Sequence, residues 1–373
     1  MTLAAFGAEV IRVDPIGGAA DYHRWPLADS GDSIYWAGLN KGKRSMAVDM
    51  RSEQGQRLVQ HLIVDSGVLI TNVTGRQWHS FETLSTQRPD LIHLEVLGRA
   101  DGSTGVDYTV NAATGFPLVT GPSGHIGPVN HVMPAWDVSC GLYAALSILT
   151  ALRLRDATGQ GSAVRLPLDD VALATAANLG FLTEALVNGT QRPRLGNAIY
   201  GQYGRDFTSS DGVSFMVVAL TPRHFRDLTE LTETTKAVAA VAETLGADFD
   251  DEGQRYLHRD VIDGLFAPWF GRHTAQEVAS ALAASSVLWE RYQSFVEVAT
   301  SARVTDNPLF AQLEQPRIGS HLAPGLPMSF DGAHTPAQPA PALGEHTAAV
   351  LADRLGMGEA EIAALVESGT VAT

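Results

Sequence analysis

Short apolar segments alternate with amphipathic ones over the first hundred residues, and this alternation constrains the fold most strongly. The apolar segments have the length and β-branched content of buried strands. Between them, Ser52–Asp65 spaces Leu58, Val59 and Leu62 along one face, which predicts an amphipathic helix. Strands are predicted within Ala8–Asp14, Ser45–Asp49, Gly67–Asn72 and Leu91–Leu97.

This order of elements predicts an α/β fold with a parallel sheet covered by helices. In sheets of this kind, ligands bind in the crevice beyond the carboxyl ends of the strands. The loops that follow Asn72 and Leu97 are therefore the first places where we expect a binding site.

The middle of the chain continues the pattern with longer helices. Pro134–Leu154 is apolar and rich in Ala, Leu and Gly, which predicts a helix buried on most of its sides. The turn Asp156–Gly161 ends it, and a short strand is predicted over Ser162–Leu166. A second buried helix is expected over Pro167–Val187, because proline suits the first turn of a helix.

A change of composition after Asn188 indicates a second, smaller domain over about 200–310, with charged helical segments and a strand at Val213–Leu220. Many prolines in Gln315–Pro341 predict an extended linker. Two final helices are expected, and they cover Gly344–Leu355 and Glu359–Ser368.

The composition fits a soluble protein of the cytoplasm. A formal net charge of −15 argues against nonspecific nucleic-acid binding, which requires dense Lys and Arg. No apolar run approaches the roughly 20 residues that cross a bilayer, and no signal segment opens the chain. The single cysteine, Cys140, cannot form an internal disulfide, which fits a reducing compartment. The local basic segment Asn40–Ser45 is compatible with an anionic small ligand.

Two adjacent carboxylates, Asp169 and Asp170, stand just inside the helix that is expected to begin at Pro167. Acidic residues are common in a first helical turn, because the macrodipole and the free N–H groups stabilise negative charge. The same environment keeps a carboxylate ionised and available as a nucleophile. Attack on a thioester would form a mixed anhydride and release a thiolate, with backbone N–H groups holding the oxyanion. The two residues alone leave both interpretations open.

Several common cofactor motifs are missing from the sequence. There is no Gly-x-Gly-x-x-Gly after a strand, no Gly-x-x-x-x-Gly-Lys-Ser/Thr and no Gly-x-Ser-x-Gly. The 12 histidines form neither a His-x-x-x-His pair nor a Cys/His cluster, so we expect no metal site. Cys140 lies within a predicted apolar helix, where we expect it to pack rather than to react.

Six segments, spread over nearly the whole chain, share their order and spacing with one known family. They are Gly7–Gly18, Asn40–Ser45, Asp137–Leu146, Thr158–Gly161, Gly344–Thr347 and Leu355–Ile362. Each is a modest signal alone, but together they are specific. The chain resembles the class III CoA-transferase family of the CaiB/BaiF type, which includes formyl-CoA transferase, carnitine CoA-transferase and α-methylacyl-CoA racemase.

The resemblance implies an α/β fold with a Rossmann-like parallel sheet in a large domain, residues 1–195. A smaller α+β domain follows over 200–310, and the segment 315–373 consists of a linker and helices that return to the large domain. The resemblance further implies an interlocked homodimer. Family members carry about two dozen further residues upstream, including a loop that contacts CoA, so we expect part of the CoA site to be missing.

The resemblance also implies the substrate and the site. The substrate is a coenzyme A thioester, no prosthetic group is needed, and the catalytic carboxylate falls on Asp170, whereas Asp169 remains a helix-start residue. The residues expected along bound CoA are Arg24, Asn40, Lys41, Lys43, Arg44, Thr71, Asn72, Val73, Leu97 and Arg99.

Four further segments resemble the branch of the family that moves CoA between the two carboxyls of mesaconyl-CoA. These segments are Val106–Phe116, Pro167–Thr175, Gly204–Phe207 and Met216–Arg223. A free substrate carboxylate suits a guanidinium fork, so Arg194, Arg205 and Arg223 are candidate partners for it, and the alternative for each is an ordinary salt bridge.

Three alternatives stay open. One is an intermolecular CoA-transferase between small carboxylic acids. Another is the α-methylacyl-CoA racemase, which needs an acid and a base on opposite faces of the α-carbon. Its histidine aligns with Leu118, and a leucine cannot transfer a proton, although His125 and His131 are close in sequence. The third is a CoA-binding protein without catalytic activity.

Overall fold

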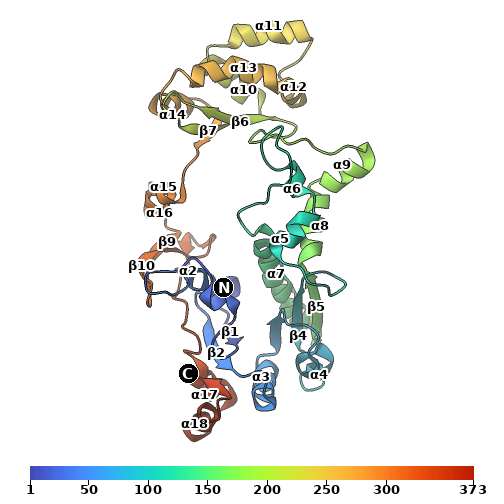
Figure 1. Cartoon of the computed structure of the whole chain (residues 1–373), viewed down its shortest axis with the longest axis vertical. Helices are drawn as coiled ribbons and strands as arrows, with labels where there is room; N and C mark the ends of the chain where they lie inside the picture. The colour runs from blue at the N-terminus through green and yellow to red at the C-terminus, as the bar shows by residue number, and fades with distance from the viewer. The chain divides into compact units, whose positions relative to one another are not determined.

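The computed structural model describes residues 1–373 as a mixed α/β chain made of two compact units (Figure 1). Unit 1 comprises Met1–Val110, Met133–Thr175 and Val298–Thr373. Unit 2 comprises Asn111–Val132 and Ala176–Glu297. The chain therefore passes between the two units after residues 110, 132, 175 and 297. The domain boundaries predicted from the sequence were at 195 to 200 and at 310.

Unit 1 contains the predicted parallel sheet, in two pieces. In one piece β3, β4 and β5 lie side by side in that order, and both pairs are parallel. In the other, β2 pairs with β1 in parallel and with β13 in antiparallel fashion. The strands are β1 (Ile11–Asp14), β2 (Arg44–Val48), β3 (Val68–Thr71), β4 (Ile92–Leu97), β5 (Ser162–Pro167) and β13 (Val371–Ala372). The strands predicted from the sequence are confirmed, whereas β13 was not predicted.

Helix α3 (Glu53–Ser66) shows why the early helix prediction was correct. The hydroxyl of Ser52 accepts the N–H of Gly55 at 3.0 Å and caps the helix, a contact typically worth about 1 kcal/mol. Leu58, Val59 and Leu62 are buried as predicted, and they share a core with the C-terminal helices α17 (Thr347–Leu355) and α18 (Glu359–Glu367). The two ends of the chain thus complete one hydrophobic core.

Helix α7 (Ala135–Thr158) corrects a prediction, because only one of its faces is buried in the chain. The buried face lies on β4 and β5. It comprises Trp136, Cys140, Ala144, Ile148 and Ala151, which are spaced three or four residues apart. The opposite face exposes large apolar side chains, namely Val138, Leu142, Tyr143, Leu146, Leu149 and Leu154. The sequence showed the apolar character of this helix but not which surface covers its second face.

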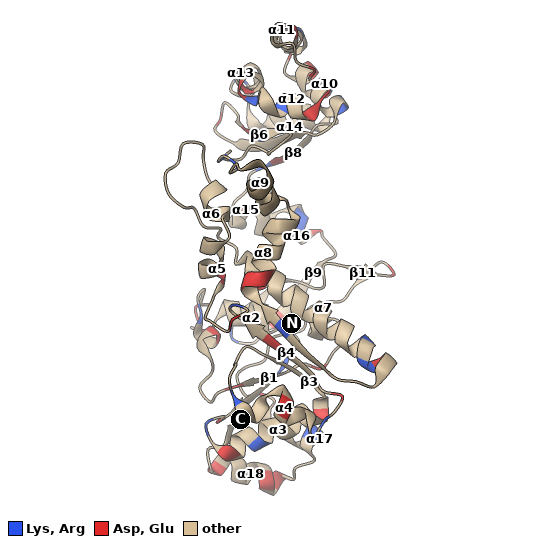
Figure 2. Ribbon diagram, turned by 90° about the vertical axis from the view of Figure 1, so that its right-hand side faces the viewer, with Lys and Arg blue, Asp and Glu red and all other residues tan.

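By length and composition, α7 is also apolar enough to cross a membrane, which the sequence alone did not indicate. In Figure 2 the ribbon of α7 has the colour of uncharged residues over much of its length and that of Lys and Arg near one end. The bent pair α8 and α9, if taken together as one span, is also long and apolar enough. Core helices pass this test as well, and the packing of Ala144 and Ile148 with strand residues of β4 identifies α7 as a core helix on that side.

The helix expected over Pro167–Val187 is in fact two helices. Pro167 is the last residue of β5, and the chain then forms α8 (Leu168–Asn178) and α9 (Phe181–Asn188), bent by 60°. Gly180 adopts φ +84° between them, a left-handed conformation that glycine adopts without strain. The single-helix prediction was wrong because the apolar pattern continued across this glycine.

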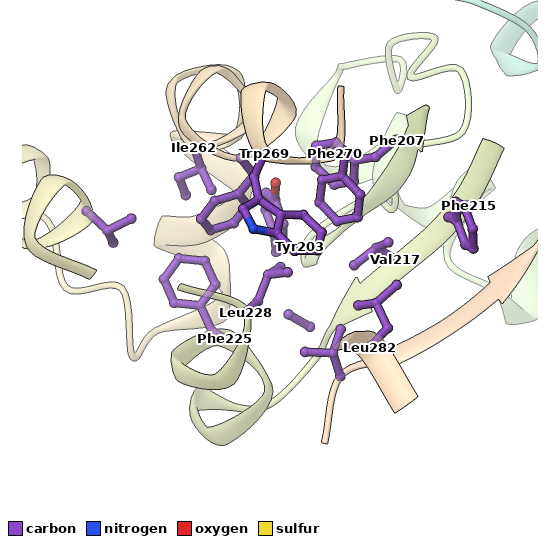
Figure 3. Packing of buried hydrophobic residues seen from close by; sticks show 14 of the residues in the cluster. Tyr203, Phe207, Phe215, Val217, Phe225, Leu228, Ile262, Trp269, Phe270 and Leu282 are labelled. Carbon is purple, nitrogen blue, oxygen red and sulfur yellow. The ribbon is translucent and has the colours of Figure 1, made fainter. Parts of the chain in front are cut away.

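Unit 2 is built around an antiparallel sheet in the order β6, β7, β8, and its core is aromatic (Figure 3). Tyr203, Phe215 and Phe266 are fully buried there. The strands are β6 (Tyr203–Thr208), β7 (Ser214–Ala219) and β8 (Leu288–Arg291). The helices packed with them are α10 (Pro222–Leu231), α11 (Thr235–Leu245), α12 (Glu252–Leu257), α13 (Arg259–Phe270) and α14 (Ala275–Ala283).

The proline-rich stretch Gln315–Pro341 is not the extended linker that its composition predicted. Strands β9 (Phe310–Gln315) and β10 (Gly319–Pro324) form an antiparallel hairpin, and the two-residue strands β11 (Ser329–Phe330) and β12 (Ala333–His334) pair next. In a hairpin of two edge strands, proline at a strand end leaves no ladder hydrogen bond unmade. Pro324 therefore fits where it stands, at the end of β10.

The remaining elements are short. In unit 1 they are α1 (Thr2–Ala5), η1 (Ala20–His23), α2 (Ile34–Leu39), η2 (Gln77–His79), α4 (Phe81–Ser85), α15 (Phe295–Thr300) and α16 (Ala302–Thr305), with α15 beginning in unit 2. Two more, α5 (Asp107–Ala113) and α6 (Phe116–Val119), carry the chain from unit 1 into unit 2.

A buried histidine in unit 1 gives the fold a predicted acid sensitivity. His79 Nδ1 is buried with no hydrogen-bond partner, and burial lowers the pKa of this imidazole from its ordinary 6.5. The folded state therefore favours neutral His79, so its contribution to stability is complete above about pH 6.5 and is lost as the pH falls below it. We expect the melting temperature to drop less between pH 7.5 and 5.5 in His79→Gln than in the wild type, measured by circular dichroism. Equal drops would contradict this role.

Candidate active site

Asp170 lies where β5 ends and α8 begins. Both acidic residues occupy the first turn of α8, as predicted, and Figure 2 shows this turn as acidic. Leu168 and Val171 are buried beneath the turn, whereas Asp170 is exposed. The backbone N–H of Asp169 donates to Gly98 O at 3.1 Å, which ties the start of α8 to the loop after β4. The Asp170 carboxylate thus projects from the carboxyl edge of the parallel sheet.

The parallel register brings three predicted segments to this same edge. Leu97 pairs with Pro167 at the end of β4, and Thr71 ends the next strand, β3. Thr71 is level with Glu95 of β4 and Arg165 of β5, so with strands about 4.8 Å apart it stands roughly 10 Å from Arg165, two residues before the end of β5. Thr71 Oγ1 accepts the N–H of Val73 at 3.0 Å, which turns the chain, and Val73 is 51% exposed. This edge can therefore line one extended ligand.

The loop after β4 is closed by its own residues. A Cβ on Gly98 would lie 2.2 Å from Gly105 N, so only glycine permits this approach of the two backbone segments. Arg99 Nη1 donates to Thr104 O at 2.5 Å across the loop. Leu97 is 6% exposed. Leu97 and Arg99 thus hold the loop in its conformation, and the loop backbone is what faces the carboxyl edge of the sheet.

A carboxylate that the sequence did not single out anchors α7 at this edge. Asp107 is buried, and its Oδ2 accepts the N–H groups of Trp136 at 2.8 Å and of Asp137 at 3.1 Å. Because α7 precedes β5 through the turn at Gly159, the N-terminus of α7 lies toward the end of the sheet where β5 finishes. Two helix N-termini, those of α7 and α8, therefore favour negative charge at this edge.

Asp137, in the first turn of α7, has a perturbed acidity. Burial raises the pKa of its carboxyl, the neighbouring Asp107 raises it further, and Arg24 acts in the opposite sense. Arg24 lies over the Tyr35 ring at 4.4 Å and donates to its hydroxyl at 3.2 Å. Arg24, which was predicted to bind CoA, therefore interacts electrostatically with Asp137 at the start of α7.

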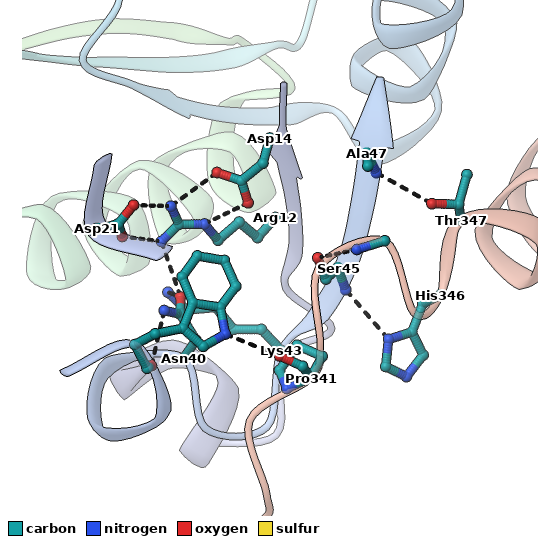
Figure 4. Close-up of polar contacts among 12 residues, drawn as sticks. Arg12, Asp14, Asp21, Asn40, Lys43, Ser45, Ala47, Pro341, His346 and Thr347 are labelled. Atoms are coloured by element: carbon teal, nitrogen blue, oxygen red, sulfur yellow. Dashed lines mark hydrogen bonds and ion pairs between the residues drawn. The ribbon is translucent and has the colours of Figure 1, made fainter. Parts of the chain in front are cut away.

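A second polar cluster surrounds Asn40 (Figure 4). Asn40 is fully buried, and its Oδ1 accepts from Arg12 at 3.1 Å and from Lys43 at 2.8 Å. Arg12 also binds Asp14 and Asp21, at 2.8 and 2.9 Å, and lies 4.3 Å above the Trp36 ring. Asn40 thus holds Arg12 and Lys43 next to each other, because both donate to its single side-chain oxygen.

The other predicted CoA cations differ in what they contact. Arg44 is engaged by two carboxylates, Glu9 at 2.6 Å and Asp353 at 2.8 Å. Lys41 Nζ reaches only the carbonyl of Pro324, at 3.4 Å, and burial lowers the pKa of its ammonium group. Burial, followed by Arg12, lowers the pKa of Lys43 in the same direction. Lys41 is therefore more open to an anionic ligand than Arg44.

The three arginines proposed for the substrate carboxylate lie in unit 2, and the structure separates their roles. Arg194 contacts backbone carbonyls, and Arg223 is exposed on α10. Arg205 forms an ion pair with Asp263, which also accepts from the Tyr203 hydroxyl at 2.8 Å. The hollow beside Arg205 is lined by Asp263 and by Asp206 too, so its formal charge is −1. This charge disfavours a carboxylate ligand there.

With this geometry established, the comparison with known proteins identifies the family. The sequence profile of CoA-transferase family III matches residues 1–347. The chain belongs to CoA-transferase family III. It is therefore an enzyme of this family, and the resemblance found in its motifs is confirmed.

Relatives within the family extend over nearly the full chain. The chain is 46% identical to the 2-methylfumaryl-CoA isomerase of Chloroflexus aurantiacus over 380 residues, covering 100% of this chain and 93% of the relative. It is 25% identical to the succinyl-CoA:mesaconate CoA-transferase of Haloarcula hispanica, covering 96% and 92%. A CAIB/BAIF family protein from Brucella suis has the same fold, with a TM-score of 0.77, 23% identity and coverage of 94% and 93%.

Within the family fold, sequence reasoning missed Asp107, and it named Asn40 only as a CoA residue. Both act through hydrogen bonds to partners 29 or 28 residues away in the sequence, which no local pattern reveals. One signal could have found Asp107, since it follows the loop after a predicted strand at the expected ligand edge. Arg12 carried no such signal, because its two carboxylate partners resemble ordinary surface charges in the sequence.

Proposed function

We propose that this enzyme is a CoA-ester isomerase that moves CoA between the two carboxyls of mesaconyl-CoA, with Asp170 as the nucleophile. The observation that carries the proposal is the exposed Asp170 carboxylate in the first turn of α8, at the sheet edge where ligands bind. Similarity over the full chain to a 2-methylfumaryl-CoA isomerase supports the substrate class.

The proposed reaction proceeds through covalent intermediates on Asp170. A carboxylate oxygen attacks the thioester carbonyl, the C–S bond breaks, and a mixed anhydride and the CoA thiolate form. The thiolate attacks the Asp170 carbonyl carbon, which gives aspartyl-CoA and frees the dicarboxylate. The second carboxylate then attacks aspartyl-CoA, forming the other anhydride and releasing thiolate, which finally attacks the acyl carbonyl. Asp170 is regenerated, and the isomeric thioester leaves.

This chemistry uses groups that the chain and the substrate themselves supply. The N-terminal end of α8 is a site that stabilises negative charge, and Asp170 would react as the carboxylate. The nucleophile, the leaving thiolate and the acceptor carboxylate balance in every step, so the proposed reaction requires no prosthetic group. With one cysteine and CoA thioesters as substrates, we assign the enzyme to the cytoplasm.

The proposal places CoA along the edge formed by the ends of β3, β4 and β5, within a Rossmann-like domain. Arg24 and Lys41 are proposed to contact the phosphates, since neither forms an ion pair with a carboxylate. Thr71, Asn72 and Val73, together with Leu97 and Arg99, would line the pantetheine arm. Asn40 and Lys43 would support this surface through their cluster, and Arg44 through its ion pairs.

The test is mass spectrometry of the purified enzyme incubated with mesaconyl-CoA alone and quenched with hydroxylamine. Formation of the isomeric thioester without added acid, and a hydroxamate on the peptide that carries Asp170, is expected. If product forms only after a free carboxylic acid is added, the enzyme is an intermolecular transferase instead. Incorporation of deuterium at the α-carbon in heavy water would indicate a racemase, which the leucine at position 118 argues against.

We propose that the enzyme is a homodimer of the interlocked type, and that a second copy covers the exposed face of α7. Val138, Leu142, Leu146 and Leu149 are each 48–58% exposed on that face. Contiguous apolar patches on a soluble chain commonly mark an interface. An apolar patch without charge suits a second identical patch.

The double substitution Leu142→Glu with Leu146→Glu is expected to prevent assembly, so that protein expressed as this variant shows half the molar mass by light scattering coupled to size-exclusion chromatography. Burying two carboxylates at an apolar interface costs several kcal/mol, which is enough to keep the chains from pairing at micromolar concentration before they interlock. Leu257→Glu is the control, because it places the same carboxylate at a leucine that is 65% exposed on α12 of unit 2. An unchanged mass in the double variant would exclude α7 from the interface.

A further inference from the structure

The position of the Asp170 carboxylate depends on the backbone of the first turn of α8. The carboxylate is exposed and accepts no hydrogen bond from the chain. Leu168 and Val171, each 6% exposed, anchor the turn on its buried side. The N–H groups of a first turn have no partner inside the helix, and that of Asp169 donates to Gly98 O at 3.1 Å. The residue next to Asp170 is therefore bonded to the loop after β4.

This loop, residues 98–105, closes on itself at Gly98. A Cβ on Gly98 would lie 2.2 Å from Gly105 N and 2.9 Å from Gly105 Cα. A Cβ on Gly105 would in turn lie 3.3 Å from Gly98 O, the atom that accepts the Asp169 N–H. Neither glycine has a positive φ, so the close approach of the backbones, and not a special conformation, excludes side chains here. Gly98 thus contacts Gly105 and Asp169 at once, through backbone atoms alone.

Hydrogen bonds inside the loop and from β5 keep it closed. Gly102 N donates to Arg99 O at 3.0 Å, and Arg99 Nη1 donates to Thr104 O at 2.5 Å. From β5, Arg165 Nη2 donates to Ala100 O at 3.2 Å. The strand that leads into α8 therefore also holds the loop to which the start of α8 is bonded.

The crossing at Gly98 has little room for adjustment. With alanine at position 98, Gly105 would have to move away by about 0.8 Å, because real Cβ atoms essentially never come within 3.0 Å of such a neighbour. Close-packed structure transmits a displacement of this size to bonded neighbours. The loop lies on one side of Gly98 and the Asp169 N–H on the other, so the displacement acts on the first turn of α8 unless the loop opens.

We propose that Gly98 is a positioning residue for Asp170: its carbonyl holds the first turn of α8, and the closed loop 98–105 holds Gly98. This inference rests on the proposed function and deepens it, since the loop then orients the nucleophile in addition to lining the pantetheine arm. Gly98 supplies no reacting atom. Its effect is geometric, because misplacement of a reacting group by about 1 Å costs on the order of 100-fold in rate.

The test compares Gly98→Ala with Gly38→Ala, a control on α2 where an added Cβ meets no atom within 4 Å. Arg165→Gln and Arg165→Lys act on the loop without adding a Cβ, and they decide the matter if Gly98→Ala does not fold. The kinetic measurements are kcat and KM for mesaconyl-CoA, and hydroxylamine trapping at Asp170 from mesaconyl-CoA and from crotonyl-CoA, which lacks the second carboxyl. Amide hydrogen exchange of Asp169 and of loop 98–105 is followed on the same proteins, and thermal melting reports whether each variant is folded.

Gly98→Ala is expected to lower kcat and to slow trapping from both esters by the same factor, about 10- to 100-fold, with KM changed by less than about threefold. Exchange of the Asp169 amide is expected to become faster, and Gly38→Ala is expected to match the wild type. Arg165→Gln should lose about 3- to 10-fold in the same way. Arg165→Lys should restore the rate, because an ammonium group can also donate to a single carbonyl.

A raised KM with unchanged kcat in Gly98→Ala would mean that the loop only lines bound CoA, and it would overturn the proposal. So would a loss in Arg165→Gln that is confined to mesaconyl-CoA, since Arg165 would then bind the second carboxylate of the substrate. Faster exchange with normal trapping would overturn it as well. If the wild type traps neither ester, the proposed function fails. The exchange of the Asp169 amide then decides alone whether Gly98 holds the turn, and equal rates in the wild type and Gly98→Ala would show that it does not.

Discussion

Replacing Asp170 with asparagine is expected to reduce turnover of mesaconyl-CoA by about 10⁴-fold or more, since loss of a covalent nucleophile typically has effects of this size. The amide retains the size of the side chain but cannot form the anhydride. Asp170 is exposed in the first turn of α8, so the substitution removes no buried contact. We therefore expect an unchanged melting temperature and retained CoA binding, measured by calorimetry.

The neighbouring substitution Asp169→Asn is the matched control. Asp169 stands in the same turn, and its contact with Gly98 O is made by the backbone N–H, which asparagine keeps. Turnover within about threefold of the wild type is expected for this variant, because the helix dipole changes little. Equal losses in Asp169→Asn and Asp170→Asn would show that the charge of the turn matters and that neither residue is the nucleophile.

The local elements around the site could be predicted because their signals are local. Ser52 caps α3, glycine at position 67 ends it in the left-handed conformation, and the strands before and after it follow the apolar segments. The position of Asp170 in a first turn also followed from its place after a predicted strand. Parallel pairing then brought Thr71 and Leu97 to the same edge, as the ligand rule for α/β sheets requires.

The partners of the charged residues could not be predicted in the same way. Arg194 resembled a substrate ligand in the sequence, but it donates to carbonyls of a segment about 70 residues earlier. Arg44 resembled a phosphate ligand, but it also bonds Asp353 at the far end of the chain. A guanidinium satisfies any planar set of acceptors equally well. Its role is therefore set by tertiary structure, which residue type and spacing do not reveal.

For the apolar faces of a helix, the residues are evident in the sequence, but the surface that covers each face is not. The sequence shows that both faces of α7 are apolar, yet only the face of Ala144 and Ile148 is covered within the chain. The free energy gained by burial depends on area removed from water, whatever the covering surface is. Composition therefore cannot distinguish a helix buried in its own domain from one that is covered by a second copy.

The second large effect is expected at Arg255, where Arg255→Met should lower the free energy of unfolding by about 3 kcal/mol. Arg255 is fully buried on α12, and burial lowers the pKa of its guanidinium. Nη1 donates to Phe249 O at 2.7 Å and to Asp250 O at 3.1 Å, and Nη2 donates to Leu220 O at 2.9 Å. No carboxylate is hydrogen-bonded to it, so these carbonyls make its hydrogen bonds, while Glu252 and its acidic neighbours favour the charge from a greater distance.

Two opposing effects decide the sign of this change. Methionine removes a desolvated charge and adds apolar contact with Phe225, which alone would stabilise the fold. It also leaves the carbonyl of Leu220 at the end of β7 and those of Phe249 and Asp250 without their donor, and each such loss costs about 1–3 kcal/mol. The loss of three hydrogen bonds to carbonyls outweighs the gain from removing the desolvated charge. Urea unfolding followed by circular dichroism should show a lower midpoint for Arg255→Met than for Arg226→Met, whose arginine is exposed. A midpoint equal to or above the wild type would mean that water replaces Arg255 at these carbonyls, and that the buried charge does not hold the end of β7 to the turn before α12.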